Sequence, residues 1–146
     1  MGTTTFSGPI KAGTIREGAT ANTGQVLMAQ TDFFDYTDTS DKTLGIIIPA
    51  NSQIVNIAVS TEAAFDAGTT NHCDVGIVGN SDLYIDNLSI GNTGNKGGGA
   101  HDLVANWLDV GTSDVTLAAK YIQSGSAATA GVARITVMYQ QNNNLA

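Results

Sequence analysis

Two segments in the C-terminal third of the chain alternate between apolar and polar side chains, residue by residue. A period of two places every second side chain on the same face of a β-strand. We therefore expect Val115–Ile122 and Val132–Tyr139 to be strands, joined by the small polar segment Gln123–Gly131. They are predicted to form the central core hairpin of a single all-β domain, with these side chains facing inward: Val115, Leu117, Ala119 and Tyr121 on the first strand, and Ala133, Ile135, Val137 and Tyr139 on the second.

A second pair of apolar, β-branched runs lies in the first half of the chain, within Leu44–Ser60. The runs flank Pro49–Ser52, a cluster of turn-forming residues. Proline cannot donate a hydrogen bond to a strand ladder, so the first run is expected to end there. We predict a hairpin here as well, in which Val55, Ile57 and Val59 share one face of the second strand.

Shorter strands are expected elsewhere, separated by polar turns, at Gln25–Gln30, Cys73–Val78, Leu83–Ile85 and Leu88–Ile90. Two polar segments are predicted to be loops. Thr31–Thr43 carries aspartates spaced by three residues, and Gly91–Gly99 is rich in glycine. Ala100–Leu108 alone has helical spacing, which predicts two helical turns that dock Trp107 onto an edge of the domain.

The first 24 residues hold regularly spaced glycines and few apolar side chains. They predict an extended arm with one edge strand at Lys11–Arg16, either a floppy terminus or a segment that orders against a partner. The chain is thus divided into an N-terminal arm (1–24), an antiparallel β-sandwich domain (25–141) with one short helix, and a polar tail (142–146).

Composition supports an all-β protein and limits the classes of partner that we expect it to bind. Only 13% of the 146 residues are charged, and 17 are glycine. Thirteen acidic against six basic residues give a net charge of −7. Nucleic-acid binding needs Lys and Arg to replace phosphate counterions, and anionic membranes repel a negative protein, so neither partner is expected. Cys73 is the only cysteine, which excludes an intrachain disulfide and predicts a buried thiol.

No residues form a recognisable catalytic, cofactor or metal constellation, and the chain is expected to be non-enzymatic. The aspartates of Thr31–Thr43 lack the two-residue ligand spacing of an EF-hand loop. His101 stands next to Asp102, and adjacent helical residues do not face each other. His72 and Cys73 are expected on opposite faces of one strand. A carbohydrate-binding sandwich is an alternative, with a stacking platform drawn from the aromatics Phe33, Phe34, Tyr84 and Trp107.

Three segments carry a resemblance to a known family: Ile48–Thr70, Trp107–Tyr121 and Thr129–Gln141. Together with the opening Thr3–Ile15, they resemble small virion structural proteins of tailed bacteriophages, notably marine ones. The resemblance implies a capsid decoration (cement) protein, with a β-sandwich or jelly-roll fold, no catalytic residues and no cofactor. It also implies a location on the outer surface of the head, the major capsid protein as partner, and a homo-oligomer, with a trimer favoured.

For a capsid decoration protein, the arm and the segment Ser124–Gly131 are expected to contact neighbouring subunits or the capsid shell. The candidate interaction residues are Phe6, Pro9, Ile10, Ile15, Ser124 and Thr129. A tail or head–tail structural component shares every argument from composition and stays open as an alternative.

Overall fold

The computed structural model describes residues 11–15, 21–25, 27–97 and 104–141. Its elements follow the chain in this order: β1 (Lys11–Ile15), β2 (Ala21–Gln25), β3 (Leu27–Asp35), β4 (Lys42–Ile48), β5 (Ser52–Ala63), β6 (Thr70–Ile77), β7 (Asn80–Ser89), β8 (Gly94–Gly97), the 3-10 turn η2 (Val104–Trp107), β9 (Val115–Ser124) and β10 (Val132–Gln141). In these ranges no helix is long and apolar enough to cross a membrane.

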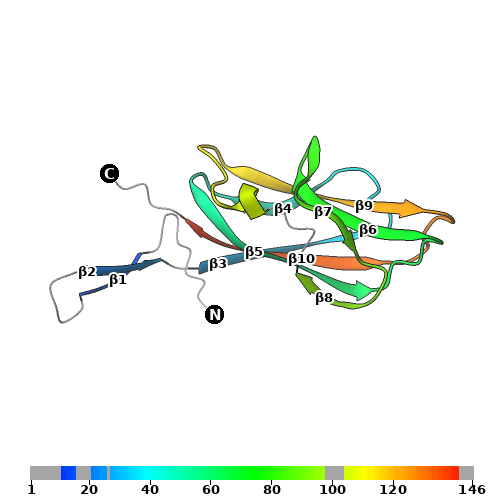
Figure 1. The fold of residues 1–146 in the computed structure, drawn as a ribbon, viewed down its shortest axis with the longest axis horizontal. Helices are drawn as coiled ribbons and strands as arrows, with labels where there is room; N and C mark the ends of the chain where they lie inside the picture. Colours follow the sequence, from blue (N-terminus) through cyan, green and yellow to red (C-terminus); the bar gives the residue numbers. More distant parts are fainter. Residues whose placement is uncertain (1–10, 16–20, 26, 98–103, 142–146) are drawn as a thin grey trace, which may run out of the picture.

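Eight strands form two antiparallel sheets of four, stacked as the two layers of a sandwich (Figure 1). One sheet has the order β3-β10-β5-β8 and the other the order β4-β9-β6-β7. From β3 to β10 the chain changes sheet at every connection except the β6–β7 hairpin. This alternation over eight strands is the jelly-roll arrangement, so the predicted fold class is confirmed.

The inner faces of the two sheets form one hydrophobic core, and the alternating pattern identified most of it. Leu117, Ala119 and Tyr121 of β9 are buried. On β10 the predicted face is buried throughout: Ala133, Ile135, Val137 and Tyr139. Cys73 is fully buried on β6, as predicted for a structural thiol.

The two predicted hairpins are wrong in their pairing. β9 and β10 lie in different sheets, where each is a central strand, and so do β4 and β5. A period-two pattern sets which face of a strand is buried, and it is the same whether the next strand lies beside it or across the core. Asn51, at φ 56°, stands in the connection that carries the chain from β4 to β5.

A β-bulge in β5 explains a second difference. Met138 of β10 is opposite Asn56, while the next residue, Tyr139, is opposite Ile54. Val55 is therefore an extra residue with no partner on β10, and the side-chain alternation shifts there. Ile54 and Ile57 are buried and Val55 is 46% exposed, so the prediction that Val55 shares a face with Ile57 and Val59 is wrong.

Three elements differ from the predicted boundaries. β3 extends through Asp35, so that the loop expected over Thr31–Thr43 is restricted to residues 36–41. The two short strands predicted within 83–90 are one strand, β7, with Asn87 at φ 59° where an irregularity interrupts the pairing with β6. Gly94–Gly97, expected to be loop, forms the edge strand β8 beside β5.

Only the second half of the predicted helix lies within the described residues. Residues 100–103 lie outside the described ranges, and 104–107 form the single 3-10 turn η2. Trp107 docks as predicted: its side chain is buried and its Nε1 donates a hydrogen bond to the carbonyl of Tyr84 on the edge strand β7. Leu108, expected on the same face, is 65% exposed, because a single short turn does not continue the helical period.

The described part of the arm is a hairpin rather than one extended edge strand. β1 pairs with β2 in register from Lys11 opposite Gln25 to Ile15 opposite Ala21. The strand expected at Lys11–Arg16 is present over Lys11–Ile15, with Arg16 outside the described residues, and its partner is β2 and not the sandwich. Figure 1 shows this hairpin beyond the start of β3, at one end of the domain.

Candidate functional site

The end of the sandwich far from β1 and β2 is built from loops that bind one another. Asp66, between β5 and β6, accepts three hydrogen bonds from two residues of the β9–β10 loop. Its Oδ1 accepts from the backbone N–H groups of Thr129 (2.7 Å) and Ala130 (3.0 Å), and its Oδ2 accepts from the Thr129 hydroxyl (2.7 Å). Backbone bonds add to this link, since the N–H of Gly68 donates to the Ser126 carbonyl. The loop predicted to touch neighbours is therefore held in a defined shape by its own chain.

These hydrogen bonds also change the pKa of Asp66. The Thr129 hydroxyl, with the N–H groups of Ala130 and Thr129, lowers the pKa of the Asp66 carboxyl below its usual value, because these donors stabilise the charged form. Ser124 is also held by a hydrogen bond, because its hydroxyl donates to Oγ1 of Thr70 at 2.6 Å. The side chains of Asp66, Ser124 and Thr129 nevertheless remain exposed at the surface, so this end of the domain offers a rigid polar rim.

Three aromatic rings support this rim from below. Phe65 stacks on Phe34 with ring centroids 5.7 Å apart and contacts Tyr121 at 4.7 Å. Gly131, at φ 145°, lies directly against the Phe65 ring, where a Cβ would clash. The backbone of Gly131 also accepts a hydrogen bond from the N–H of Tyr36. The aromatic cluster thus fixes the start of β10 and the loop before it.

Three of the six predicted interaction residues, Ile15, Ser124 and Thr129, lie within the described ranges, and they are at opposite ends of the protein. Phe6, Pro9 and Ile10 lie outside the described residues, and Ile15 ends β1. Ser124 ends β9 and Thr129 lies in the β9–β10 loop, at the opposite end of the sandwich (Figure 1). Sequence reasoning missed Asp66, although a single aspartate in a polar connection gives no signal of its partner some sixty residues away.

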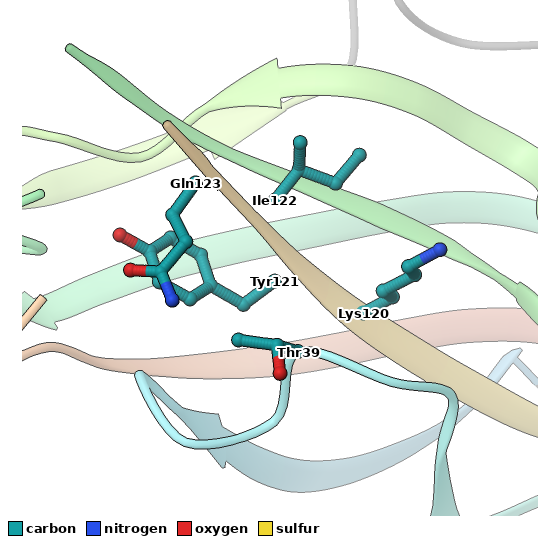
Figure 2. Close-up of a pocket in the computed structure, with 5 residues that line it drawn as sticks. All are labelled: Thr39, Lys120, Tyr121, Ile122 and Gln123. Atoms are coloured by element: carbon teal, nitrogen blue, oxygen red, sulfur yellow. The ribbon is translucent and has the colours of Figure 1, made fainter. Parts of the chain in front are cut away.

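An open depression of about 350 Å³ lies on one side of β9, lined by Thr39 and residues 120–123. Figure 2 shows Thr39, from the loop before β4, beside the side chains of Tyr121 and Gln123. Tyr121 belongs to the core, and its hydroxyl donates to Oδ1 of Asn71. Lys120 is the one charged side chain of this lining, and the depression assembles no nucleophile, base or ligand set.

Within the described ranges, no three His, Cys, Asp or Glu side chains are grouped as they would be around a metal ion. Burial raises the pKa of the Cys73 thiol far above its usual range, with the neighbouring Asp74 adding to the effect, so this thiol is not a nucleophile. His72 contacts Oδ1 of Asn87 through Nδ1, away from Cys73. His101 and Asp102 lie outside the described residues.

The aromatic platform considered for sugar binding is not present. Phe34, Tyr84 and Trp107 are buried, with exposed fractions of 1%, 2% and 6%. Phe33 alone of the four is substantially exposed. A sugar ring stacks on an accessible aromatic face, so these residues do not form such a surface.

Comparison with known proteins finds a similar fold in a solved structure. No family model matches the chain, and no curated protein matches it. A solved structure described as the cyanophage Pam1 capsid asymmetric unit contains a chain that superposes with a TM-score of 0.64 at 12% sequence identity. The match covers 86% of this chain and 95% of that one, so the shared feature is the architecture of the whole domain.

Proposed function

We propose that this chain is a non-enzymatic structural protein of a bacteriophage virion, and specifically a decoration protein on the outer surface of the head. The observation that carries the proposal is the fold likeness: this jelly-roll domain superposes on nearly the whole length of a chain in a cyanophage capsid structure. Jelly rolls also occur in lectins and cupins, so the fold alone does not decide the function.

Two features favour a capsid role over those alternatives. The described residues lack both a metal-ligand cluster and an exposed platform of the four aromatics discussed above. In addition, the rigid loop end and the β1–β2 hairpin give the domain contact surfaces at both ends (Figure 1). A protein that reinforces a shell needs broad contacts rather than a pocket.

Charge supports the outer rather than the inner side of the shell. A net charge of −7 is unfavourable next to packaged DNA and is compatible with the outer surface. The partner under this proposal is the major capsid protein, bound by a homo-oligomer of this chain. The family resemblance favours a trimer.

The arm gives the sharpest test. Deletion of residues 1–13 removes Phe6, Pro9, Ile10 and part of β1, and leaves the sandwich strands β3–β10 intact. We expect the truncated protein to keep its circular dichroism spectrum and melting temperature while it loses co-sedimentation with phage heads that lack their own copy. Deletion of residues 142–146 is the matched control and should leave binding unchanged. Unchanged binding of the arm deletion would overturn the role of the arm.

Location on the particle separates the head from the tail. Cryo-electron microscopy of virions, with a gold-labelled affinity tag on this chain, is expected to place the label over the head surface. Label confined to the tail or to the head–tail junction would replace the decoration role with that of a tail or connector component. A glycan array with the same protein is expected to give no signal, and binding there would support the lectin alternative.

A further inference from the structure

The β1–β2 hairpin belongs to neither sheet of the sandwich. β1 and β2 pair with each other and with no other described strand. Their sequences, KAGTI and ANTGQ, contain few apolar side chains that could be buried between them. A two-stranded hairpin by itself is only marginally stable in water, and three or more strands are needed for independent stability. The hairpin therefore requires a further strand along one of its edges.

Two edges of the sandwich, β3 and β4, are not available for this purpose, because side chains join them to each other. The side-chain amide of Gln30 binds both the N–H and the carbonyl of Ile47. Asp32, two residues further along β3, accepts the N–H of Gly45. A strand that added to either edge would have to break these hydrogen bonds.

The edge strand β7 is covered in a different way, by the 3-10 turn η2. Nδ2 of Asn106 donates to the carbonyl of Leu83 at 2.7 Å, and Nε1 of Trp107 donates to the carbonyl of Tyr84 at 3.3 Å. Because the Trp107 ring is also buried, this cover is part of the folded core. A further strand cannot pair here without displacing it.

The fourth edge is β8. Its four residues pair with Ala58–Thr61 of β5 on one side, and no described residue binds the backbone on its other side. The Ser60 hydroxyl donates to Oδ1 of Asn95 at 3.2 Å, a bond that only reinforces the pairing with β5. Alternate residues of an antiparallel strand direct both backbone groups outward. β8 thus presents unpaired N–H and C=O groups, which are a template for strand addition.

The hairpin cannot reach β8 of its own chain. Leu27, where β3 begins, lies opposite Gln140 of β10, whereas Ala58 lies opposite Thr136. A strand beyond β8 is therefore about 14 Å along the sheet and about 19 Å across it from Leu27, roughly 24 Å in all. Ala21, at the far end of β2, precedes Leu27 by six residues, which span about 20 Å at most. The two edges can meet only between different molecules.

We propose that β1 of one copy of this chain adds as an extra strand to the β8 edge of a second copy. The hairpin lacks a third strand, β8 lacks an outer neighbour among the described residues, and the chain keeps the two apart within one molecule. β1 makes the contact rather than β2, because a single residue separates β2 from β3 and the sandwich restricts access to β2. The sheet β3-β10-β5-β8 is then continued by two strands of the neighbouring copy.

Strand addition obtains its affinity from main-chain hydrogen bonds rather than from a large buried area. The hairpin and β8 are different surfaces, so the contact is heterologous and is completed when the copies close into a ring. Each copy then donates one hairpin and accepts one, which strengthens the assembly beyond a single contact. The inference rests on the homo-oligomer of the proposed function and names the contact that holds it together.

Light scattering coupled to size-exclusion chromatography, on the protein alone over a range of concentrations, tests the assembly. We expect a concentration-dependent oligomer for the full chain and for the deletion of residues 142–146. The deletion of residues 1–13, which removes part of β1, should be monomeric. Phage heads are absent from this assay, so an oligomer that survives the deletion overturns the strand addition and leaves the proposed binding to heads to its own test.

Proline substitutions test the β8 edge. Asn95 and Lys96 are adjacent in β8, so one directs its N–H to β5 and the other directs it outward. Proline removes the N–H, and the variant that keeps the wild-type melting temperature identifies the outward position. We expect that variant to raise the dissociation constant of the oligomer at least about tenfold, whereas Asn92→Pro, outside β8, is the control and should assemble normally. If both β8 variants lower the melting temperature, crosslinking decides.

Crosslinking between two single variants tests the contact directly. Cys73 is buried, so the introduced cysteines are the reactive thiols. A mixture of Thr14→Cys, on β1, and Asn95→Cys, on β8, should give a covalent dimer with a short bismaleimide, whereas Thr14→Cys mixed with Thr116→Cys should not. Equal crosslinking in both mixtures would overturn the proposal. A wild type that is monomeric at every concentration would also overturn it, and would point to a strand of the capsid shell as the occupant of β8.

Discussion

Gln30 on β3 and Ile47 on β4 join the two sheets through a pair of hydrogen bonds. Nε2 of Gln30 donates to the Ile47 carbonyl at 2.6 Å, and the Ile47 N–H donates to Oε1 at 3.0 Å. Two residues along β3, Asp32 accepts the N–H of Gly45 at 2.6 Å, which lowers the pKa of that carboxyl. Both strands are sheet edges, so side chains here satisfy backbone groups that a neighbouring strand otherwise binds.

The first prediction concerns this link. Gln30→Leu removes both hydrogen bonds to Ile47, and we expect the free energy of unfolding to fall by about 1–2 kcal/mol. Urea denaturation followed by circular dichroism measures the change. Thr116→Val, at an exposed position of β9, is the control and should stay within about 0.5 kcal/mol of the wild type. An unchanged midpoint for Gln30→Leu would mean that water replaces the side chain without loss.

The β-character and the buried faces of the fold were predictable from the sequence, and the strand partners were not. Leu117 and Ile135 alternate with polar neighbours, which identifies their burial but not the sheet to which each belongs. Val55 stands in an apolar run, and its exposure results from a bulge that depends on the partner strand β10. Local pattern contains no information about these long-range relationships.

The segment Ser124–Gly131 was likewise predictable only in part. Its small polar composition marked Ser124 and Thr129 as surface residues, which they are. Its internal order comes from Asp66, which is distant in the sequence and has no distinctive neighbours. The arm residues Phe6, Pro9 and Ile10 remain predictions, to be tested by the deletion described above.

A second prediction follows from the Asp66 tether. Asp66→Ala removes the acceptor of Thr129 and Ala130, so hydrogen exchange of these two amides should accelerate several-fold while the core strands are unaffected. Asp82→Ala, on β7, is the control for the loss of a charge. Equal protection of the loop in Asp66→Ala would show that backbone bonds alone hold it.

The same tether has a defined pH dependence. Because hydrogen bonding lowers the pKa of Asp66 in the folded state, its contribution is complete above the unfolded value, 3.8. It is lost as the pH falls through the lower folded pKa. Loop exchange, corrected for the intrinsic rate, should therefore increase only at strongly acidic pH in the wild type, and should be high at every pH in Asp66→Ala.

The pH dependence of stability that we expect from Asp74 has the opposite sign. Burial, with Asp86 and Asp82 nearby, raises its pKa in the folded state, so the folded protein binds this proton more tightly than the unfolded chain does. Its favourable contribution is complete below the unfolded pKa and is lost as the pH rises through the folded one. Asp74→Asn keeps an acceptor for the N–H of Asn87, and should raise the melting temperature at pH 7 by a few degrees. An equal gain at pH 3 would contradict this electrostatic origin.

A last prediction compares two glycines. Gly131 and Gly79 both have positive φ, 145° and 86°, but a Cβ at Gly131 would clash with the Phe65 ring and one at Gly79 would meet open space. We expect Gly79→Ala to cost about 1 kcal/mol of unfolding free energy and Gly131→Ala about 3 kcal/mol or more. Urea denaturation of both variants measures the difference. Equal losses would mean that strain in the backbone, rather than the aromatic cluster, decides the cost.

The alternation of the chain between sheets has a consequence for how the protein acquires its shape. β10 is a central strand of its sheet and contacts β3 along its whole length, although about one hundred residues separate the two. A sheet of this order stays incomplete on the ribosome until residues 132–141 have emerged. Folding is then dominated by contacts between distant parts of the chain, which is typical of slow folders. The sandwich is therefore expected to form only once β10 is available, in one late cooperative step.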